Sequence, residues 1–584
     1  MCGVFAYKGD KADAAAVIFA GLKTLEYRGY DSWGIAVQST EKIALQKQTG
    51  KIGDSILQLP QSTVGIGHTR WATHGGVTKE NAHPHMDCTG KIALLHNGII
   101  ENFAELKKTL MHHAFSSETD TEVLIHLIED LRKKFPLREA VRMAFQKITG
   151  LNAVVVLDNT TGEIVAVKNG SPLVIGVGDN AYFIASDVTG ILPYTKKVIF
   201  LEDNELVTID KKLAIRSVRT NKILQPKIET LQWHIESADK GKFAHFMLKE
   251  IYEQPQVLEN LATTAKENIE KIATAIKKTH GTFFIGAGTA YHATLAGTYL
   301  FSHIAKRHVN TQFASEFNYL EDFLNEKSLV IALSQSGETI DVIEPLQRAK
   351  RKKAHIMSIT NTLGSTLYRM SDTAFLLHAG PEKAVASTKV YTAKLATLLL
   401  TAYALVDAYA TGQKIVLAAA GEIERLFEKA NVEKIQKLAK KLMGKEHMYT
   451  IGRGFAYATA LEAALKIKEV SYIHTEGLAG GELKHGPIAL IEKNTPCIVF
   501  APADESYDAI ISNATEIKAR GGFIVGVSSK NAPIFDAWIE VKDTGMGSLI
   551  TQIIPIQLLS YYLALYKKLD PDKPRNLAKS VTVK

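Results

Sequence analysis

The sequence predicts an α+β domain followed by two tandem, doubly wound α/β domains. In the first part of the chain, short β-branched runs such as Asn152–Leu157 are mixed with helical stretches such as Ala14–Leu25 and Thr121–Lys134, which is typical of an α+β domain. Further along, strand, glycine-rich turn and helix follow one another repeatedly, as in doubly wound domains. The length of 584 residues agrees with three or four domains at about 150 residues each.

The doubly wound part contains an internal repeat. The run Phe284-Ile-Gly286-Ala-Gly288 has a counterpart in Thr450-Ile-Gly452-Arg-Gly454, and a second strand and turn follow each of them at a similar distance. Two copies of one unit explain this spacing. We therefore expect the following division: a first domain over 1–220, a connector over 221–250, the two copies over 265–412 and 436–574, and a tail over 575–584.

Composition is that of a globular protein. Hydrophobic residues make up 46% and charged residues 22%, and the net charge of +8 is spread along the chain, so we expect no nucleic-acid partner. The apolar runs 393–412 and 549–566 contain polar and charged residues and are interpreted as buried helices, with no membrane partner expected. The N-terminus lacks the pattern of a secretory signal. Three scattered cysteines indicate a cytoplasmic setting and no disulfide framework, zinc site or other metal site.

Cys2 is a candidate N-terminal nucleophile. If Met1 is removed, the thiol and a free α-amine belong to the same residue. The amine has an ordinary pKa near 8 and can accept the thiol proton at neutral pH. A cysteine at position 2 is by itself more often part of a disordered terminus, so its interpretation depends on the motifs that follow it.

Those motifs are Leu25–Ser32, His68–Gly75, Leu95–Ile99 and Ser117–Glu122, which follow Met1–Ala6 in order. They resemble the class II glutamine amidotransferase domain, an N-terminal-nucleophile αββα sandwich. The resemblance implies that Cys2 attacks the side-chain amide of glutamine. It also implies roles for the following residues: Asn97 and Gly98 hold the oxyanion, Arg70 the substrate carboxylate and Asp120 its ammonium, with Trp71 and His74 completing the glutamine site.

These assignments agree with the chemistry of the side chains. A guanidinium matches a carboxylate bidentately, and an amide N–H beside a glycine suits a developing oxyanion. Alternatives stay open for three residues: Arg28 and His74 could only shape loops, and Trp71 could be core packing, although the family places it at an ammonia gate.

Hydroxyl-rich turns at strand-to-helix junctions predict a phosphate site in the first doubly wound copy. Ser334-Gln335-Ser336-Gly337-Glu-Thr339 closes an apolar strand and opens a helix, where backbone N–H groups and the helix dipole favour an anion. Gly288 and Thr289 precede it, and Val385 and Ser387 follow. The set resembles the SIS (sugar isomerase) fold in both copies. Ala290 replaces a serine usual in that family, so one hydroxyl contact is lost.

Glu462, Lys466 and Glu469 are predicted to share one face of a helix over Ala460–Tyr472. Their spacing of four and three residues brings them together, and the residues between them are largely apolar. A solvated row of salt bridges is the usual alternative. Charges on such an apolar helix, however, need partners or a site.

Taken together, the motifs make the whole chain resemble the glutamine–fructose-6-phosphate aminotransferase family. The resemblance implies that Glu469 moves a proton between C1 and C2, His485 opens the sugar ring across a homodimer interface, and Lys579 forms an imine with the ketose. Glu462, Lys466 and Ala578 would help to build the sugar site. The implied substrates are glutamine and fructose 6-phosphate, the product glucosamine 6-phosphate, at the first step of amino-sugar (UDP-N-acetylglucosamine) synthesis, with no cofactor.

Two other hypotheses remain at this point. One is a glutaminase that supplies a deglycase or a different sugar-phosphate acceptor. The other is a non-catalytic sugar-phosphate sensor, which would not need Cys2, Glu469, His485 and Lys579 together. Feedback inhibition by a nucleotide sugar is not expected, because the connector is short.

Overall fold

The computed structural model describes residues 2–53, 55–231 and 240–581. The chain divides into two compact units, Met1–Asp239 with Ala578–Lys584, and Lys240–Leu577. Part of the predicted connector (232–239) and the last three residues of the tail lie outside the described residues. The described part of the connector holds two short strands and a helix: β14 (Ile223–Leu224), β15 (Glu229–Thr230) and α6 (Phe246–Tyr252).

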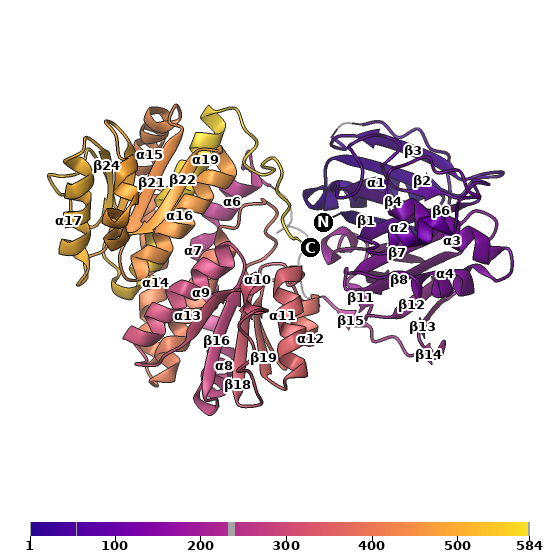
Figure 1. Ribbon diagram of the computed structural model, residues 1–584, viewed down its shortest axis with the longest axis horizontal. Helices are drawn as coiled ribbons and strands as arrows, with labels where there is room; N and C mark the ends of the chain where they lie inside the picture. The colour runs from indigo at the N-terminus through magenta and orange to yellow at the C-terminus, as the bar shows by residue number, and fades with distance from the viewer. Residues whose placement is uncertain (1, 54, 232–239, 582–584) are drawn as a thin grey trace. The chain divides into compact units, whose positions relative to one another are not determined.

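The first unit is built around two antiparallel sheets, and this confirms the predicted αββα sandwich (Figure 1). The strands of the eight-stranded sheet are, in order, β15, β11 (Lys197–Phe200), β9 (Val174–Val177), β10 (Ala181–Ala185), β1 (Gly3–Gly9), β4 (Val64–Arg70), β2 (Ser32–Val37) and β3 (Ala44–Thr49). Those of the seven-stranded sheet are β14, β13 (Leu213–Ser217), β12 (Glu205–Ile209), β8 (Ile164–Asn169), β7 (Asn152–Asp158), β6 (Ile92–Gly98) and β5 (His85–Met86).

Helices complete the four layers. Those of the first unit are α1 (Ala14–Leu25) and α5 (Val188–Ile191), which pack with the larger sheet, and α2 (Phe103–Lys108), α3 (Thr121–Arg132) and α4 (Leu137–Phe145), of which α3 and α4 pack on the smaller sheet. Alternating apolar side chains of both sheets, such as Val4 and Leu95, form the central core. The opposite face of the smaller sheet buries residues such as Val154 against α3 and α4. Burial on both faces explains the continuous apolar runs of β6 and β7.

The second unit contains two five-stranded parallel sheets with the same strand order (Figure 1). The first is β17 (Asn310–Phe313), β16 (Gly281–Gly286), β18 (Ser328–Leu333), β19 (His355–Thr360) and β20 (Thr373–Leu376). The second is β22 (His474–Ala479), β21 (His447–Gly452), β23 (Pro496–Ala501), β24 (Phe523–Ser528) and β25 (Ala537–Glu540). Two copies of one doubly wound unit, predicted from the glycine spacing, are confirmed.

The helices of this unit surround both sheets. They are α7 (Gln254–Thr264), α8 (Lys266–Lys278), α9 (Thr289–His303), α10 (Ala314–Phe317), α11 (Ile340–Arg351), α12 (Thr366–Met370), α13 (Lys389–Leu405), α14 (Tyr409–Leu426), α15 (Lys429–Leu442), α16 (Phe455–Ser471), α17 (Tyr507–Lys518), α18 (Ser548–Thr551) and α19 (Ile554–Tyr566), with α6 and the short 3-10 helices η3 (Gly480–His485) and η4 (Pro487–Leu490). Residues of α9, α13, α16 and α19 share one continuous apolar core.

The two equivalent glycine turns have the same conformation. Gly288 and Gly454 precede α9 and α16 with φ of 52° and 55°, a region that favours glycine. In the same turns, a Cβ on Gly286 would lie 2.8 Å from the Ala290 backbone, and one on Gly452 would lie 2.1 Å from that of Ala456. Each turn thus needs its glycines in order to bring a helix N-terminus against the end of a strand.

The interpretation of both apolar runs as buried is confirmed, but the first run is not one helix. The stretch 393–412 is divided between α13 and α14, because Asp407 adopts a positive φ of 55°. Its carboxylate accepts a hydrogen bond from Lys277 Nζ at 3.1 Å. The second run lies in Gly545–Tyr566, whose most apolar stretch is 94% buried inside the protein. This stretch comprises α18 and α19, and its burial is that of core helices.

Candidate active sites

Cys2 borders a cavity in the first unit, at the start of the central strand β1. The lining residues come from the ends of β4 and β6, from the loops after them and from the start of α3: Cys2, Arg70, Trp71, Thr73, His74, His83, His96, Asn97, Gly98, Thr119, Asp120 and Thr121. All six residues predicted for the glutamine chemistry besides Cys2 itself are among them. Antiparallel pairing of β1 with β4, with Gly3 opposite Thr69, brings the first residues of the chain to the Arg70–Trp71 corner.

The Cys2 thiol is held next to a backbone donor. The Trp71 N–H donates to Cys2 Sγ at 3.2 Å. Burial raises the pKa of Cys2, and this effect exceeds the opposing influence of the Trp71 N–H and the Arg70 guanidinium. A thiol whose pKa is raised needs a proton acceptor before it can act as a nucleophile. The geometry therefore agrees with the predicted need for a base close to the sulfur.

The side-chain amide of Asn97 is oriented by a histidine that the sequence analysis did not single out. Asn97 Nδ2 donates to the Cys2 carbonyl at 3.0 Å, and Asn97 Oδ1 lies 2.9 Å from His68 Nε2. Burial lowers the pKa of His68 to about 3, so its ring is neutral. The hydrogen-bond network then assigns the proton to Nε2, which donates to Oδ1. His68 thereby fixes the amide with Nδ2 directed toward the Cys2 carbonyl.

Gly98 occupies a position that admits no side chain. Its φ is +135°, and a Cβ there would lie 2.1 Å from the carbonyl oxygen of Leu151. This close packing places the backbone of Gly98 at the cavity wall beside Asn97. A backbone N–H and a side-chain amide at the end of one strand are suitable donors for an oxyanion.

Two charged side chains, Arg70 and Asp120, line the cavity. The Arg70 guanidinium donates to the carbonyl oxygens of Gly75 and Gly76 at 3.0 and 2.9 Å and also contacts that of His74. Arg70 therefore fixes the 74–76 loop and also lines the cavity. The Asp120 carboxylate accepts from the Ile100 N–H at 2.7 Å, which fixes its position at the start of α3.

Arg28 has the structural role that the sequence left open. Its Nη1 lies 3.0 Å from Asp187 Oδ2, and the side chain is buried. Asp187 in turn caps α5 by accepting from the Thr189 N–H. Arg28 is not among the lining residues of the cavity.

Replacement of Asn97, or of the His68 ring that orients its amide, is expected to lower the rate of glutamine hydrolysis. Asn97→Ala should reduce kcat by about 10²- to 10³-fold, the usual cost of an oxyanion donor. His68→Leu should reduce it by about tenfold, because the amide loses one orienting bond, whereas His68→Gln retains an N–H donor and should restore most of the rate. Steady-state glutaminase kinetics will test this: kcat should fall with KM unchanged. Equal loss in both His68 variants would contradict the positioning role.

The second constellation lies between α9 and α16 in the second unit. Glu462 and Lys466 are 0% and 1% exposed. Glu462 accepts from Thr289 Oγ1 at 3.1 Å and lies 2.7 Å from His292 Nδ1, while Lys466 Nζ lies 3.3 Å from Glu462 and contacts Glu469. The alternative of a solvated row of salt bridges is therefore wrong. His292 belongs to the cluster and was not predicted.

Electrostatics keeps Glu462 and Lys466 ionised. Burial by itself lowers the pKa of Lys466, but the carboxylates of Glu462 and Glu469 raise it above its usual value. Burial tends to raise the pKa of Glu462, and Lys466 with His292 lowers it below its usual value. Glu469 keeps 15% of its side chain exposed, so among Glu462, Lys466 and Glu469 it is the one open to a ligand.

In the predicted phosphate-binding turn, two serine hydroxyls bond to backbone N–H groups of the turn itself. Ser334 Oγ accepts from the Gly337 N–H at 3.0 Å, and Ser336 Oγ accepts from the Glu338 N–H at 3.2 Å. Gly337 has a φ of +66°, and a Cβ there would lie 2.0 Å from Ser365 Oγ. The turn thus forms a tight anchor for the N-terminus of α11, which begins directly after Thr339.

Unpartnered hydroxyls lie at the start of α13. Ser387 Oγ, Thr388 Oγ1 and Tyr391 OH are buried without a hydrogen-bond partner among the described residues. Buried hydroxyls are normally satisfied, so three together indicate a place where a polar ligand binds. Burial and the charge of Glu462 raise the pKa of Tyr391, which links this segment to the Glu462 cluster. Tyr391 and Thr388 were not predicted, whereas Val385 and Ser387 were.

Two predicted catalytic residues, His485 and Lys579, are not brought to this cluster by contacts within the second unit. His485 is exposed at the end of η3. Ala578 and Lys579 belong to the first unit. Their roles at the sugar stay predictions.

Comparison with known proteins gives the class first. Residues 68–193 match the glutamine amidotransferase domain, and residues 275–404 and 441–566 match the SIS domain. Together with the cavity at Cys2 and the Glu462 cluster, these matches define a glutamine amidotransferase domain joined to a pair of SIS domains.

Full-length relatives give the family. The chain is 42% identical to the glutamine–fructose-6-phosphate aminotransferase (isomerizing) of Thermococcus kodakarensis and 44% identical to that of Pyrococcus horikoshii, in each case over 100% of both chains. The C-terminal domain of glucosamine-fructose-6-phosphate aminotransferase from Francisella tularensis matches 57% of this chain and 99% of its own, with 33% identity and a TM-score of 0.52. The chain belongs to the glutamine–fructose-6-phosphate aminotransferase (isomerizing) family.

Proposed function

We propose that the chain converts D-fructose 6-phosphate and L-glutamine to D-glucosamine 6-phosphate and L-glutamate, the first step of amino-sugar synthesis. The observation that carries this proposal is the full-length identity to relatives of that name. The cavity at Cys2 and the buried Glu462 cluster support it, since one chain holds a nucleophile site and a separate acid–base site.

At the first site, Cys2 Sγ attacks the carboxamide carbon of glutamine. The α-amine of Cys2, freed by removal of Met1, accepts the thiol proton and passes it to the leaving nitrogen, so that ammonia departs and a thioester remains. Asn97 Nδ2 and the Gly98 N–H bind the oxyanion. Water then hydrolyses the thioester to glutamate. Arg70 and Asp120 bind the two charged groups of the substrate backbone.

At the second site, Lys579 forms an imine with C2 of the open-chain ketose, and water leaves. Ammonia then displaces the lysine nitrogen at C2 and becomes the nitrogen of the sugar imine. Glu469 removes a proton from C1 and returns it to C2, which yields the amino aldose. Lys466 holds Glu469 in place, and the segments at 334–339 and 385–388 supply the donors for the phosphate.

Labelled glutamine tests the proposed function. Incubation of the chain with fructose 6-phosphate and glutamine that carries ¹⁵N in its side-chain amide should yield glucosamine 6-phosphate with the label, one molecule for each glutamate. Unlabelled ammonium added in excess should not dilute the label, because the ammonia is proposed to pass internally. Release of glutamate and ammonia without any hexosamine phosphate would refute the reaction.

We further propose a cytoplasmic homodimer in which His485 serves the sugar site of the partner chain. Its exposure at the end of η3 supports this, because a ring-opening group so exposed needs a second surface to complete its site. Glu469→Gln and His485→Ala chains should each be inactive alone. Chains mixed as dimers should regain about one quarter of the wild-type activity, since half the dimers are mixed and each then has one intact site.

The control for this mixing experiment uses a single variant mixed with itself. Two Glu469→Gln preparations, mixed in the same way, should stay inactive. Failure of the Glu469→Gln and His485→Ala mixture to regain activity, with mixed dimers demonstrated by mass, would show that each site is built by one chain.

A further inference from the structure

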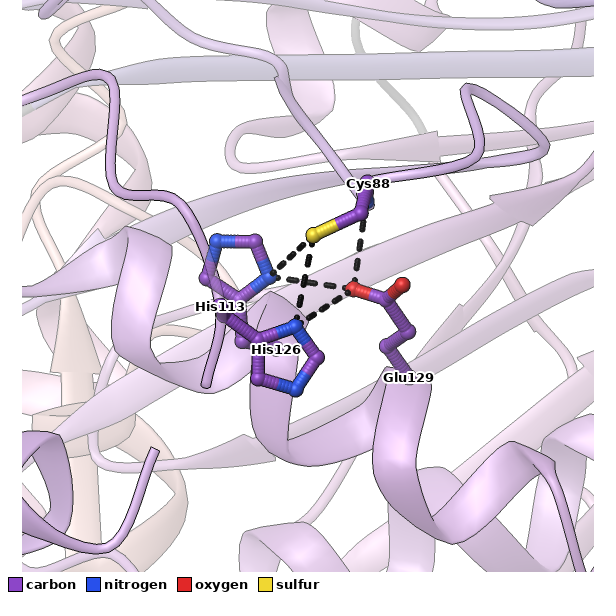
Figure 2. A group of neighbouring side chains, drawn as sticks. All are labelled: Cys88, His113, His126 and Glu129. Carbon is purple, nitrogen blue, oxygen red and sulfur yellow. Dashed lines mark hydrogen bonds and ion pairs between the residues drawn. The ribbon is translucent and has the colours of Figure 1, made fainter. Parts of the chain in front are cut away.

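A group of four metal-ligating side chains lies in the first unit, outside the cavity at Cys2. Cys88 belongs to the turn after β5, His113 to the loop between α2 and α3, and His126 and Glu129 to one face of α3. Figure 2 shows the four side chains directed toward a common point. Their ligand atoms (Sγ, two Nδ1 and one carboxylate oxygen) all lie within 4.8 Å of one another.

Four of the six distances between these atoms are close to the edges of a tetrahedron around a small cation. Cys88 Sγ lies 3.3 Å from His113 Nδ1 and 3.7 Å from His126 Nδ1. Glu129 Oε2 lies 3.3 Å from His113 Nδ1 and 3.0 Å from His126 Nδ1. Ordinary zinc bond lengths predict edges of about 3.6 Å from sulfur to nitrogen and about 3.3 Å from nitrogen to oxygen.

The donor set favours zinc over other common cations. A thiolate and a carboxylate together balance a charge of +2, and two neutral imidazoles complete four ligands. Magnesium and calcium prefer oxygen ligands only, whereas a mixture of sulfur, nitrogen and oxygen in tetrahedral positions is typical of zinc.

The far nitrogens of both rings face carboxylates. His113 Nε2 lies 3.2 Å from Asp130 Oδ1, and His126 Nε2 lies 3.8 Å from Glu122 Oε1. A carboxylate beside the far ring nitrogen is usual for metal-binding histidines, although among the described residues neither nitrogen has a partner at hydrogen-bond geometry. The side chains of His113 and His126 are 4% and 2% exposed, while Cys88 is exposed. The site is thus buried at its two histidines and accessible to an ion at Cys88.

We propose that Cys88, His113, His126 and Glu129 bind one zinc ion with a structural role. Four protein ligands leave no position for a substrate, which is the pattern of structural zinc sites. The ion would fasten the Cys88 turn and the 113–120 segment to α3. Because Glu122 accepts from the Ser116 and Ser117 N–H groups and α3 begins directly after Asp120, this clamp supports the loop that presents Asp120 to glutamine.

Metal content tests the proposal. The full chain is incubated with zinc sulfate and freed of excess ion by gel filtration. Inductively coupled plasma mass spectrometry should then find about one zinc ion per chain. Cys88→Ala and His126→Ala should each lose at least about nine-tenths of it. Cys497→Ala, His112→Ala and Cys2→Ala remove a distant thiol, a neighbouring exposed histidine and the proposed nucleophile, and should retain it. Equal zinc in Cys88→Ala and Cys497→Ala would overturn the site.

Cobalt provides a readout that does not depend on a variant folding. The wild-type chain loaded with cobalt(II) should show a sulfur-to-cobalt charge-transfer band and the intense visible bands of a tetrahedral ion, and Cys2→Ala should show the same spectrum. Zinc should also raise the midpoint of the first thermal unfolding transition. Absence of the charge-transfer band from the loaded wild-type chain would refute thiolate ligation by Cys88.

Discussion

Replacement of Cys2 with alanine is expected to abolish glutamine hydrolysis, by about 10⁴-fold or more, and to leave the isomerisation of fructose 6-phosphate measurable. Loss of a covalent nucleophile removes the whole pathway rather than a single interaction. Arg70 and Asp120 remain in the cavity, so glutamine still binds. The measurements are glutamate release from glutamine and interconversion of fructose 6-phosphate and glucose 6-phosphate, made on the same preparation.

The matched control is Cys497→Ala, which removes a thiol buried in the core of the second SIS domain. It should hydrolyse glutamine at the wild-type rate. Retention of more than a few per cent of the glutaminase rate by Cys2→Ala would show that another group attacks the amide.

Glu469→Gln is expected to lower the rate of isomerisation by about 10²- to 10⁴-fold, the contribution usual for a positioned general base. The amide is the same size but cannot accept the C1 proton. Lys466 retains Glu462 as its ion-pair partner at 3.3 Å, so the buried lysine is not left without a counter-charge. Glutamine hydrolysis should be unchanged, because Cys2 and its donors lie in the other unit.

Lys468→Gln serves as the control for Glu469→Gln, since Lys468 is the neighbouring residue on the exposed face of α16. Its rates at both sites should equal those of the wild type. A normal rate of isomerisation in Glu469→Gln, measured with fructose 6-phosphate alone, would show that another residue is the base.

The N-terminal unit is expected to lose stability as the pH falls through about 6.5, the ordinary value for histidine. Burial lowers the pKa of His68, His83, His85 and His96 in the folded chain. The unfolded chain therefore binds protons that the folded chain does not, and the slope is up to about 1.4 kcal/mol per pH unit for each histidine. Urea unfolding followed by Trp fluorescence between about pH 7 and pH 5 will measure it; an unfolding free energy that stays constant would contradict this interpretation.

Local patterns predicted the fold because each is short-range. Glycines at 288 and 454 indicated the same strand-to-helix turn in two copies, and the structure places both at positive φ before equivalent helices. The break between α13 and α14 was missed for the same reason. It depends on Asp407, which adopts a positive φ although residues 402–411 around it hold no glycine or proline.

Partners that are distant in the sequence could not be predicted. Asn97 was predicted from its motif, but its orientation depends on His68, 29 residues earlier. Glu462 was placed on a helix face, but the side chains that keep it charged include His292, 170 residues away. The group around Cys88 draws its four ligands from three separate segments, so no spacing rule of a zinc motif applies to it.

The account of the first site depends on a terminal amine at Cys2, and the intact mass of fully active protein tests it directly. The scheme predicts a mass lower by one methionine residue, together with an N-terminal peptide that begins at cysteine. Full glutaminase activity in material that retains Met1 would contradict it, because the thiol would then lack the base on which every later step is built.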